Sequence, residues 1–228
     1  MTIVSRNTPV TLVGGSQLSD NDLTIALSLA PTLVAADGGA QTVLAAGLRP
    51  VAVIGDMDSI SDAAREAFAD LLHPVPEQET TDFDKALRHI AAPLVIALGV
   101  MGGRLDHELA MLNGLVCRPG QRCVALGAGN VVFLCPPTVH LDLAAGTPVS
   151  LFPMGPVQMR SEGLEWPTDG LHFAPSGRIG TSNAARGAVR LRPDGPGMLV
   201  ILPREELAEV VRALQAPEAC ETWPARGG

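Results

Sequence analysis

Two aspartates directly follow an apolar segment in the first quarter of the chain. The sequence VIGDMDSI, residues 53–60, begins like a buried strand and then places Asp56 and Asp58 on either side of Met57. Glycine and aspartate also favour turns, so this stretch alone fits a simple acidic turn as well as a functional site. In an extended chain the two carboxylates point to opposite sides, about 6–7 Å apart along the backbone. A shared cation would therefore require a bend, which Gly55 makes inexpensive.

Acidic residues recur at three other places where a predicted strand ends or a helix begins. Asp37 ends one apolar run and precedes Gly38 and Gly39. Further along the chain lie the segments EQETTDFDKAL (77–87), with Glu79 and Asp82, and MGGRLDH (101–107), with Arg104, Asp106 and His107. In a parallel α/β sheet the carboxyl ends of the strands meet at one edge. Turns alone would scatter acids over both edges, so we expect a functional cluster.

This set of residues indicates a metal and phosphate site. Clustered carboxylates repel one another unless a cation is present, and Mg²⁺ prefers oxygen ligands that it shares with substrate phosphates. The glycine pairs allow backbone N–H groups to approach a phosphate. Arg104 and Lys85 supply cationic groups. The residues predict a metal-dependent site for a nucleotide or polyphosphate.

Other common catalytic motifs are missing from the sequence. It has no G-x-x-x-x-G-K-[ST] segment and no G-x-G-x-x-G after the first strand, and VGGSQ (13–17) is too weak to indicate either. It also lacks a G-x-S-x-G segment and a histidine-rich metal pattern.

The order of apolar runs and helical patterns defines the elements that must position these residues. The runs lack polar alternation, as is typical of strands covered on both faces, and the segments between them have apolar residues three or four apart. The predicted strands are 10–15, 32–39, 51–56, 94–100, 123–128 and 131–136, and the predicted helices are 20–30, 61–72, 81–91 and 104–117. We expect a mostly parallel α/β/α sheet domain over residues 1–136.

The texture changes after residue 136. Residues 138–202 are dense in glycine and proline and contain short strand-like runs without a helical pattern. They predict a small antiparallel β-sandwich, so that residues 137–228 form a second domain with a C-terminal helix at 204–215. The tail, residues 221–228, is expected to be loose.

Composition excludes several classes of function. The 228 residues carry a net charge of −8, which disfavours a nucleic-acid partner. The sequence has no apolar run long enough for a membrane span and no signal-peptide pattern, so we expect a cytoplasmic protein without a membrane partner. The spacing of the four cysteines argues against a zinc site and predicts buried free thiols at Cys117, Cys123, Cys135 and Cys220.

Four ordered motifs resemble those of the thiamine pyrophosphokinase (thiamine diphosphokinase) family. They are ADGGA (36–40), GDMDSI (55–60), ETTDFDK (79–85) and GGRLDH (102–107). In the second domain, GLEWP (163–167) and GTSN (180–183) resemble the thiamine-side motifs. Three positions depart from the family pattern: Gln41 replaces an asparagine, Met57 a phenylalanine and Glu79 an aspartate.

The resemblance implies transfer of the diphosphate of ATP to the hydroxyl of thiamine, with Mg²⁺ as cofactor and ATP as co-substrate. It implies Mg²⁺ ligation by Asp56, Asp58 and Asp82, with Glu79 as a fourth ligand. Arg104 would contact phosphate, and Asp106 would line the catalytic site. The expected nucleotide and cofactor contacts are Asp37, Gly38, Gly39, Ser59, Lys85, Arg104 and His107.

The same resemblance assigns thiamine to the second domain. The indole of Trp166 suits stacking on a flat cation, and Ser182 and Asn183 can hydrogen-bond to a pyrimidine edge. In the family the thiamine pocket lies between domains of two subunits, which implies a homodimer. Two alternatives stay open: another Mg²⁺-dependent diphosphokinase, for example one acting on a pterin alcohol, or a non-catalytic thiamine- or nucleotide-binding regulator.

Overall fold

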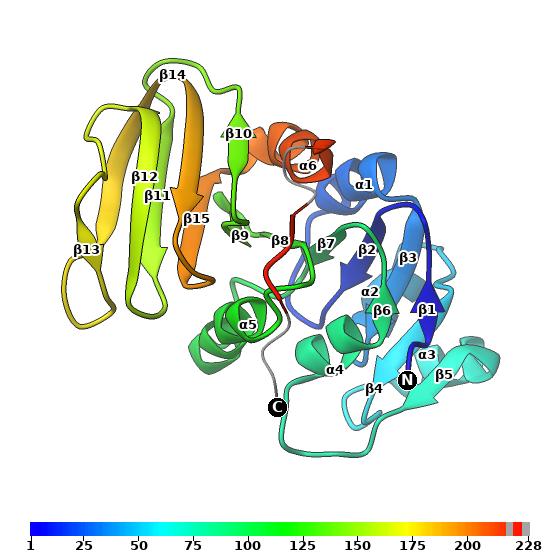
Figure 1. Cartoon of the computed structure of the whole chain (residues 1–228). Helices are drawn as coiled ribbons and strands as arrows, with labels where there is room; N and C mark the ends of the chain where they lie inside the picture. The colour runs from blue at the N-terminus through cyan, green and yellow to red at the C-terminus, as the bar shows by residue number, and fades with distance from the viewer. Residues whose placement is uncertain (218–220, 225–228) are drawn as a thin grey trace. The chain divides into compact units, whose positions relative to one another are not determined.

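A computed structural model describes residues 1–217 and 221–224 of the chain, which divides into two compact units (Figure 1). The first comprises Met1–Gly114 and Ala125–Ala128, and the second Leu115–Val124 and Gly129–Gly228. The chain therefore passes between the units after residues 114, 124 and 128, and the second of these points lies within strand β8 (Cys123–Leu126). The second unit starts before the expected boundary at residue 137, because β9 (Asn130–Leu134) pairs with β15 (Met198–Pro203).

A parallel sheet forms the centre of the first unit. Its strands lie in the order β7, β2, β3, β4, β5, all parallel, and the predicted parallel α/β fold is confirmed. The bounds are β2 (Val10–Val13), β3 (Thr32–Ala36), β4 (Ala52–Gly55), β5 (Leu72–Pro74) and β7 (Val95–Leu98). Every residue of β2, β4 and β7 is buried, which explains why these strands read as continuous apolar runs.

The helices of the first unit connect these strands. They are α1 (Asp20–Leu29), α2 (Gly39–Ala45), α3 (Asp62–Ala67), α4 (Asp82–Arg88) and α5 (Leu105–Cys117). The seven-residue helix α2 was not predicted, because it begins inside the expected strand 32–39. The expected helix 61–72 is too long: the chain forms a 3₁₀ turn, Ala69–Leu71, and then β5. Likewise, α4 is followed by β6 (Ile90–Ala91), which pairs with β1 (Val4–Ser5).

The strand order creates a place for a ligand. Strand β2 lies between β3 and β7 in the sheet. In the chain, β3 follows β2 directly, whereas β7 comes only after β3, β4 and β5. The chain therefore leaves β2 in one direction along the sheet and returns on its other side. Loops that leave neighbouring strands at such a switch point diverge, and ligands of open α/β sheets bind in the resulting crevice.

The second unit is rich in antiparallel strands, as predicted (Figure 1). It contains β10 (Val139–Leu141), β11 (Pro148–Pro153), β12 (Val157–Leu164), β13 (His172–Phe173) and β14 (Gly180–Pro193), with β9 and β15. The long strand β14 pairs with β11 through its first part and with both β10 and β12 through its last part. A sandwich consists of two sheets, and here β14 pairs both with β11 and with the group formed by β10 and β12.

The C-terminal segment is more ordered than expected. A 3₁₀ turn, Arg204–Glu206, leads into α6 (Leu207–Gln215), which packs on β10 and confirms the predicted helix. In the tail, Trp223 Nε1 donates a hydrogen bond of 2.9 Å to the carbonyl of Cys135, so the expectation of a loose tail is wrong there. Residues 225–228 of the predicted tail lie outside the described residues.

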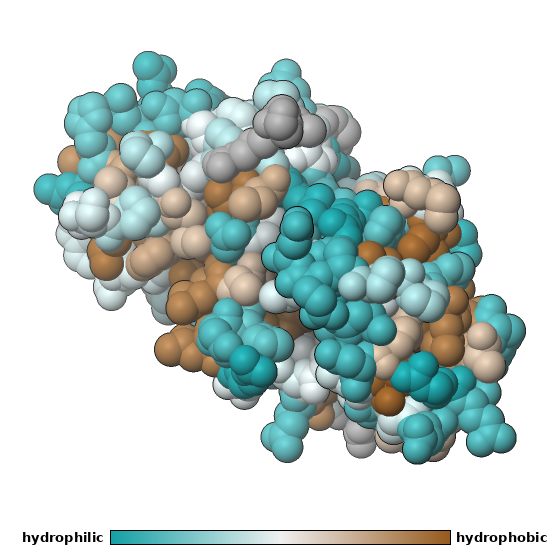
Figure 2. All heavy atoms as spheres, turned by 90° about the horizontal axis from the view of Figure 1, so that it is seen from below, coloured by the Kyte–Doolittle hydropathy of each residue, from teal (hydrophilic) through white to brown (hydrophobic). Residues whose placement is uncertain are grey.

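The structure corrects the prediction for one cysteine, and its helices bear on the prediction about a membrane span. Cys123 and Cys135 are buried free thiols, whereas Cys117, expected to be buried, is exposed, and Cys220 lies outside the described residues. Within the described chain, no helix has the length and apolarity that crossing a membrane requires. On the face seen in Figure 2, hydrophobic side chains lie in small groups among hydrophilic ones.

Candidate functional site

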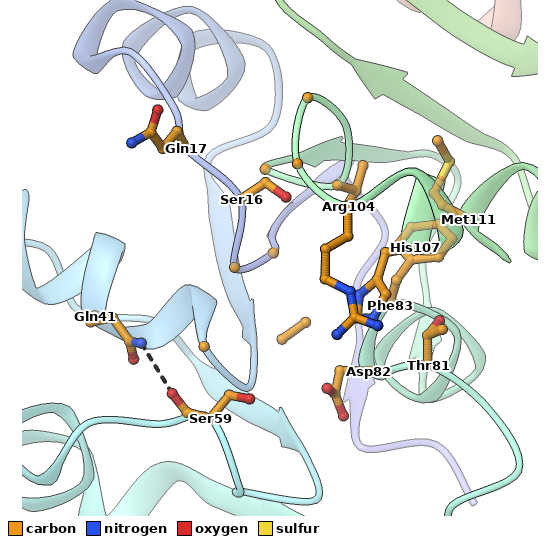
Figure 3. A pocket seen from close by; sticks show the side chains of 18 residues that line it. Ser16, Gln17, Gln41, Ser59, Thr81, Asp82, Phe83, Arg104, His107 and Met111 are labelled. Carbon is orange, nitrogen blue, oxygen red and sulfur yellow. Dashed lines mark hydrogen bonds between the residues drawn. The ribbon is translucent and has the colours of Figure 1, made fainter. Parts of the chain in front are cut away.

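A cavity of about 560 Å³ opens at the carboxyl ends of β2, β3 and β7. Its walls come from the loops after these strands, from the start of α4 and from the first turns of α5. Figure 3 shows Gln41 and Ser59 on one side of the pocket, with Thr81, Asp82, Arg104 and His107 on the other. The switch point of the sheet is therefore occupied by a pocket, and predicted site residues line it.

Glycines bring the loops of the pocket into backbone contact. A Cβ at Gly39 would lie 2.0 Å from the carbonyl oxygen of Val13, and one at Gly14 would lie 2.6 Å from that of Gly99. Gly99 has a φ of +62°, a conformation that favours glycine. Side chains at these positions would push the loops after β2, β3 and β7 apart. The VGGSQ segment, which was too weak a motif in the sequence, lines the pocket through residues 14–17.

Three carboxylates converge beside this pocket. Asp37, Asp56 and Asp58 each offer an oxygen atom, and these atoms lie within 4.8 Å of one another. The chain bends at Met57, whose φ is +69°, and the Asp58 N–H donates a 3.3 Å hydrogen bond to Asp56 Oδ1. The predicted bend between the two aspartates is confirmed. The Arg65 guanidinium donates to the carbonyl of Met57 at 2.5 Å and stabilises this turn.

Gly55 has a different role from the one expected. It is the last residue of β4 rather than the turn itself. A Cβ there would lie 2.7 Å from the Cβ of Asp37 and 3.1 Å from Asp82 Oδ1. The absence of a side chain at Gly55 therefore allows acids from two neighbouring elements to approach the end of β4.

Asp82 is bound to Lys85 and is not one of the three converging carboxylates. Lys85 Nζ lies 2.6 Å from Asp56 Oδ2 and 3.2 Å from Asp82 Oδ1, and Lys85 is only 1% exposed. Lys85 is therefore a buried residue of α4 and not part of an exposed helix surface. Burial opposes the charges, but these hydrogen bonds hold the pKa of Asp56 below and that of Lys85 above its ordinary value.

Asp37 is the most perturbed of the acids. Burial raises its pKa to about 6, and the negative charges of Asp82 and Asp56 act in the same direction, against a hydrogen bond from the Ser59 N–H. Its Oδ1 atom is buried and has no hydrogen-bond partner among the described residues. Asp37 thus brings a buried, unpaired oxygen to a group of three converging carboxylates, which fits a divalent cation that would offset their repulsion.

The other predicted residues of this site fall into three groups. Gly38, Ser59 and His107 line the pocket, and Gly39 supports it from behind. Glu79 is exposed and belongs neither to the lining nor to the converging carboxylates.

Arg104 also lines the pocket and is exposed. Its guanidinium lies 2.6 Å from the carboxylate of Asp106 and holds the pKa of Asp106 near 2.

Several residues in contact with this site were missed by sequence reasoning. The Gln78 side chain donates to Asp56 Oδ2 at 3.2 Å. Gln41 donates to the Ser59 carbonyl at 3.1 Å and accepts from the Ser61 N–H, so its amide fixes the loop after the acids. Ser16 and Gln17 line the pocket. The glycine pair directly after the first parallel strand was the available signal for the latter two.

A second, smaller cavity lies in the second unit. It has a volume of about 170 Å³, and Trp166 and Asn183 are among its lining residues. Trp166 is 60% exposed, so it is not a core residue. Asn183 is buried, and its amide oxygen accepts from the N–H groups of Trp166 and Ala184 while its nitrogen donates to the Trp166 carbonyl at 2.8 Å. Asn183 therefore holds the backbone of Trp166 in place.

The fold and the pocket define an α/β protein with an acidic, glycine-lined site suited to a phosphorylated ligand. Two family models match the chain: "Thiamin pyrophosphokinase, catalytic domain" over residues 23–125 and "Thiamin pyrophosphokinase, vitamin B1 binding domain" over residues 138–192. The chain belongs to the thiamine pyrophosphokinase family.

A curated relative carries the name of this family, and two solved structures share the fold. "Thiamine pyrophosphokinase 3" of Oryza sativa subsp. japonica is 30% identical over 158 residues, which are 60% of this chain and 59% of the relative. The chain thus spans less than two thirds of that relative's length. "Thiamin pyrophosphokinase from Candida albicans" has the same fold, with a TM-score of 0.72 at 16% identity, over 88% of this chain and 92% of that one. The Bacillus subtilis enzyme structure gives 0.70 at 21% identity, over 86% and 98%.

Gly55→Ala should destabilise the protein by about 1–3 kcal/mol, because the new methyl group would displace Asp37 or Asp82. It should also weaken binding of a divalent cation to the acidic group. Chemical unfolding and Mn²⁺ titration measure the two effects. Gly129→Ala is the matched control, since its Cβ would meet no atom within 4 Å. Equal stability and equal Mn²⁺ binding in both variants would contradict the packing argument.

Asp37→Asn should stabilise the cation-free protein at neutral pH by about 1–3 kcal/mol. A carboxyl group with a raised pKa in the folded state stabilises the fold below its ordinary pKa of 3.8, and this contribution is lost as pH rises through about 6. Thermal unfolding in EDTA should therefore show similar stabilities at low pH and an advantage of the variant at neutral pH. If the stabilities of the two proteins differ by the same amount at low and neutral pH, the pKa of Asp37 is not raised in the folded protein.

Proposed function

We propose that the chain is a thiamine diphosphokinase, which transfers the diphosphate of ATP to the primary hydroxyl of thiamine and releases thiamine diphosphate and AMP. The observation that supports this most is the convergence of Asp37, Asp56 and Asp58, with its unpaired buried oxygen, beside a glycine-lined pocket at the switch point of the sheet. The thiamine hydroxyl attacks the β-phosphorus, the bond from that phosphorus to the α-phosphate oxygen breaks, and the hydroxyl proton is released.

Asp37, Asp56 and Asp58 would hold the magnesium ion, which when bound screens the phosphate oxygens. This ligand set differs from the expected one, since Asp37 takes the place that Asp82 and Glu79 were expected to occupy. Asp82 instead orients Asp56, whose N–H donates to Asp82 Oδ1 at 3.4 Å. Phosphoryl transfer depends on positioning and charge stabilisation, so rigidly held carboxylates are what the reaction requires.

The cationic and backbone donors of the pocket would bind the triphosphate. Arg104 is exposed and lines the pocket, and its partner Asp106 is also exposed, so the guanidinium can turn from Asp106 to a phosphate at low cost. Backbone donors would come from Gly15, Gln17 and Gly38, which line the pocket. The N–H groups of Gly14 and Ser16 already donate to the carbonyls of Leu98 and Gly99.

Thiamine would bind through the second unit. The exposed indole of Trp166 offers a face for stacking on a flat cation, and Asn183 fixes the backbone that carries it. Most of the Asn183 amide is engaged with the protein. The neighbouring Ser182 is exposed and is not among the residues that line the second cavity, and its hydroxyl would be the donor to a pyrimidine edge. We propose that two chains form a homodimer, as the family resemblance implies, and that the protein is cytoplasmic, which its free thiols favour.

Two other functions would use the same acidic group. A diphosphokinase acting on a pterin alcohol would share the first unit, but the GLEWP and GTSN segments at the second cavity favour thiamine. A non-catalytic regulator would not need three mutually repelling carboxylates beside a phosphate pocket. Incubation with ATP, Mg²⁺ and either thiamine or a pterin alcohol separates these functions by whether AMP forms and which alcohol is diphosphorylated.

Asp56→Asn and Asp58→Asn should each lower thiamine diphosphate formation by about 100-fold or more while the fold persists, because each removes a charge from the proposed ion site. Formation of AMP and thiamine diphosphate, together with circular dichroism, measures activity and folding. Asp70→Asn removes an equivalent charge from an exposed ion pair with Arg49 and serves as the control. Full activity in both site variants would rule out this metal assignment.

Trp166→Ala should raise the KM for thiamine by about 3- to 30-fold and leave the KM for ATP unchanged, because it removes a stacking face worth about 0.5–2 kcal/mol. Steady-state kinetics with each substrate varied in turn measure this. Trp223→Ala is the matched control, as Trp223 bonds to Cys135 and is not part of the lining of the second cavity. A Trp166 variant with an unchanged thiamine KM would remove the indole from the substrate site.

A further inference from the structure

Lys85 is the only lysine in the sequence, and all other side chains of the Lys and Arg group are arginine. Arginine serves the ion pairs described at the surface, for example with Asp70, Asp106 and Glu165. The single ammonium group lies on α4 and is 1% exposed, among the largest fully buried side chains of the described chain. A lone lysine that is almost completely buried in the acidic site calls for a reason.

The contacts of Lys85 connect two elements that carry acids. Its Nζ atom bonds to Asp56 Oδ2, at the end of β4, and to Asp82 Oδ1, at the start of its own helix. Asp82 Oδ1 also accepts the Asp56 N–H at 3.4 Å, and Gln78 donates to the same Asp56 oxygen as Lys85. These bonds tie the loop before α4, the helix itself and the turn after β4 together around one cation.

The chemistry of the site favours an ammonium over a guanidinium. A buried charge is costly unless it is paired, and here two carboxylates pair with one compact head group that has three donors. Lys85 is not among the residues that line the pocket, whereas Arg104 is. A residue that binds ATP phosphate directly must reach that pocket, and the atoms that Lys85 reaches belong to Asp56 and Asp82.

We propose that Lys85 is a positioning residue that acts as an internal counter-ion: it fixes Asp56 against Asp82 before any cation or nucleotide binds, and it is not a phosphate ligand. The ammonium of Lys85 then offsets part of the negative charge of the four carboxylates, Asp37, Asp56, Asp58 and Asp82. This positive charge stabilises the fold of the site when no cation is bound. The inference takes the identity of the cation from the proposed function, but its tests measure stability and a lysine signal rather than turnover.

Lys85→Met should make folding depend on divalent cations. In EDTA its Tm should fall on the order of 10 °C below that of the unaltered protein, because a buried pair loses one partner. Millimolar Mg²⁺ alone should recover most of this loss, since a bound cation replaces the missing charge. Arg49→Met removes one positive charge from an exposed pair with Asp70, so its Tm in EDTA should change little, and Mg²⁺ should raise it no more than it raises that of the unaltered protein.

A phosphate-binding role predicts a different result. Lys85→Met would then keep its Tm in EDTA and lose only the stabilisation that ATP provides, and this outcome would overturn the proposal. Lys85→Arg gives a second check: the charge is kept, but the larger guanidinium must fit a position that is only 1% exposed, so its Tm in EDTA should lie between those of the unaltered and Met proteins. A Tm in EDTA equal to that of the unaltered protein would count against the proposal.

The uniqueness of Lys85 allows a test without any variant. Protein labelled with [ε-¹⁵N]lysine should give one side-chain ammonium signal, visible because buried, hydrogen-bonded protons exchange slowly with water. Mg²⁺ alone should shift this signal, since the ion binds the carboxylates that hold the ammonium. A signal that is unaffected by Mg²⁺ but moves with metal-free ATP would overturn the proposal. These readouts hold even if the chain has no diphosphokinase activity, so failure of the proposed function would be seen separately.

Discussion

Mutual repulsion of carboxylates at the end of β4 is the constraint on which the rest of the site depends. Asp37, Asp56 and Asp58 place their oxygens within 4.8 Å of one another, and Asp82 raises the pKa of Asp37 further. A fold can hold such a group only if opposite charge and rigid backbone offset the repulsion. The buried ammonium of Lys85 supplies one positive charge within the chain, and a divalent cation would add two more. The acids thus stay close together without a bound cation, and their arrangement suits one.

The backbone supplies the rigidity. The parallel sheet fixes where β3 and β4 end, and Gly55 lets Asp37 and Asp82 approach because it has no Cβ to separate them. The glycine loops after β2 and β7 are in close contact with each other, and both line the pocket at the switch point of the sheet. The position of the pocket is therefore a property of strand order, whereas its chemistry is a property of a few side chains at the strand ends.

Sequence reasoning found the features that burial and topology impose. Strands buried on both faces stand out as apolar runs, and acids at successive strand ends must meet at one edge, so β2, β4, β7 and the acidic group could be predicted. The partner of each acid could not, because it depends on side-chain direction. Lys85 donates to Asp56, and the Asn183 amide donates to the backbone carbonyl of Trp166. Helix α2 was hidden because its small apolar residues continue the run of the preceding strand.

Both candidate sites contain non-glycine residues with a strained backbone conformation. Among the residues that the structure describes, the non-glycine residues with positive φ are Asp37, Met57 and Ser182. Asp37 belongs to the acidic group, and Met57 lies between its other two members in the chain. Ser182 precedes Asn183 in the segment beside Trp166. Such conformations cost about 1–3 kcal/mol each and persist only where surrounding contacts hold them. Arg65 bonds to the carbonyl of Met57, the Ser59 N–H to Asp37, and the Ser150 hydroxyl accepts the N–H of Ser182. Each strained residue has its own anchor, so stability is spent in the two places where a ligand would need a preformed surface.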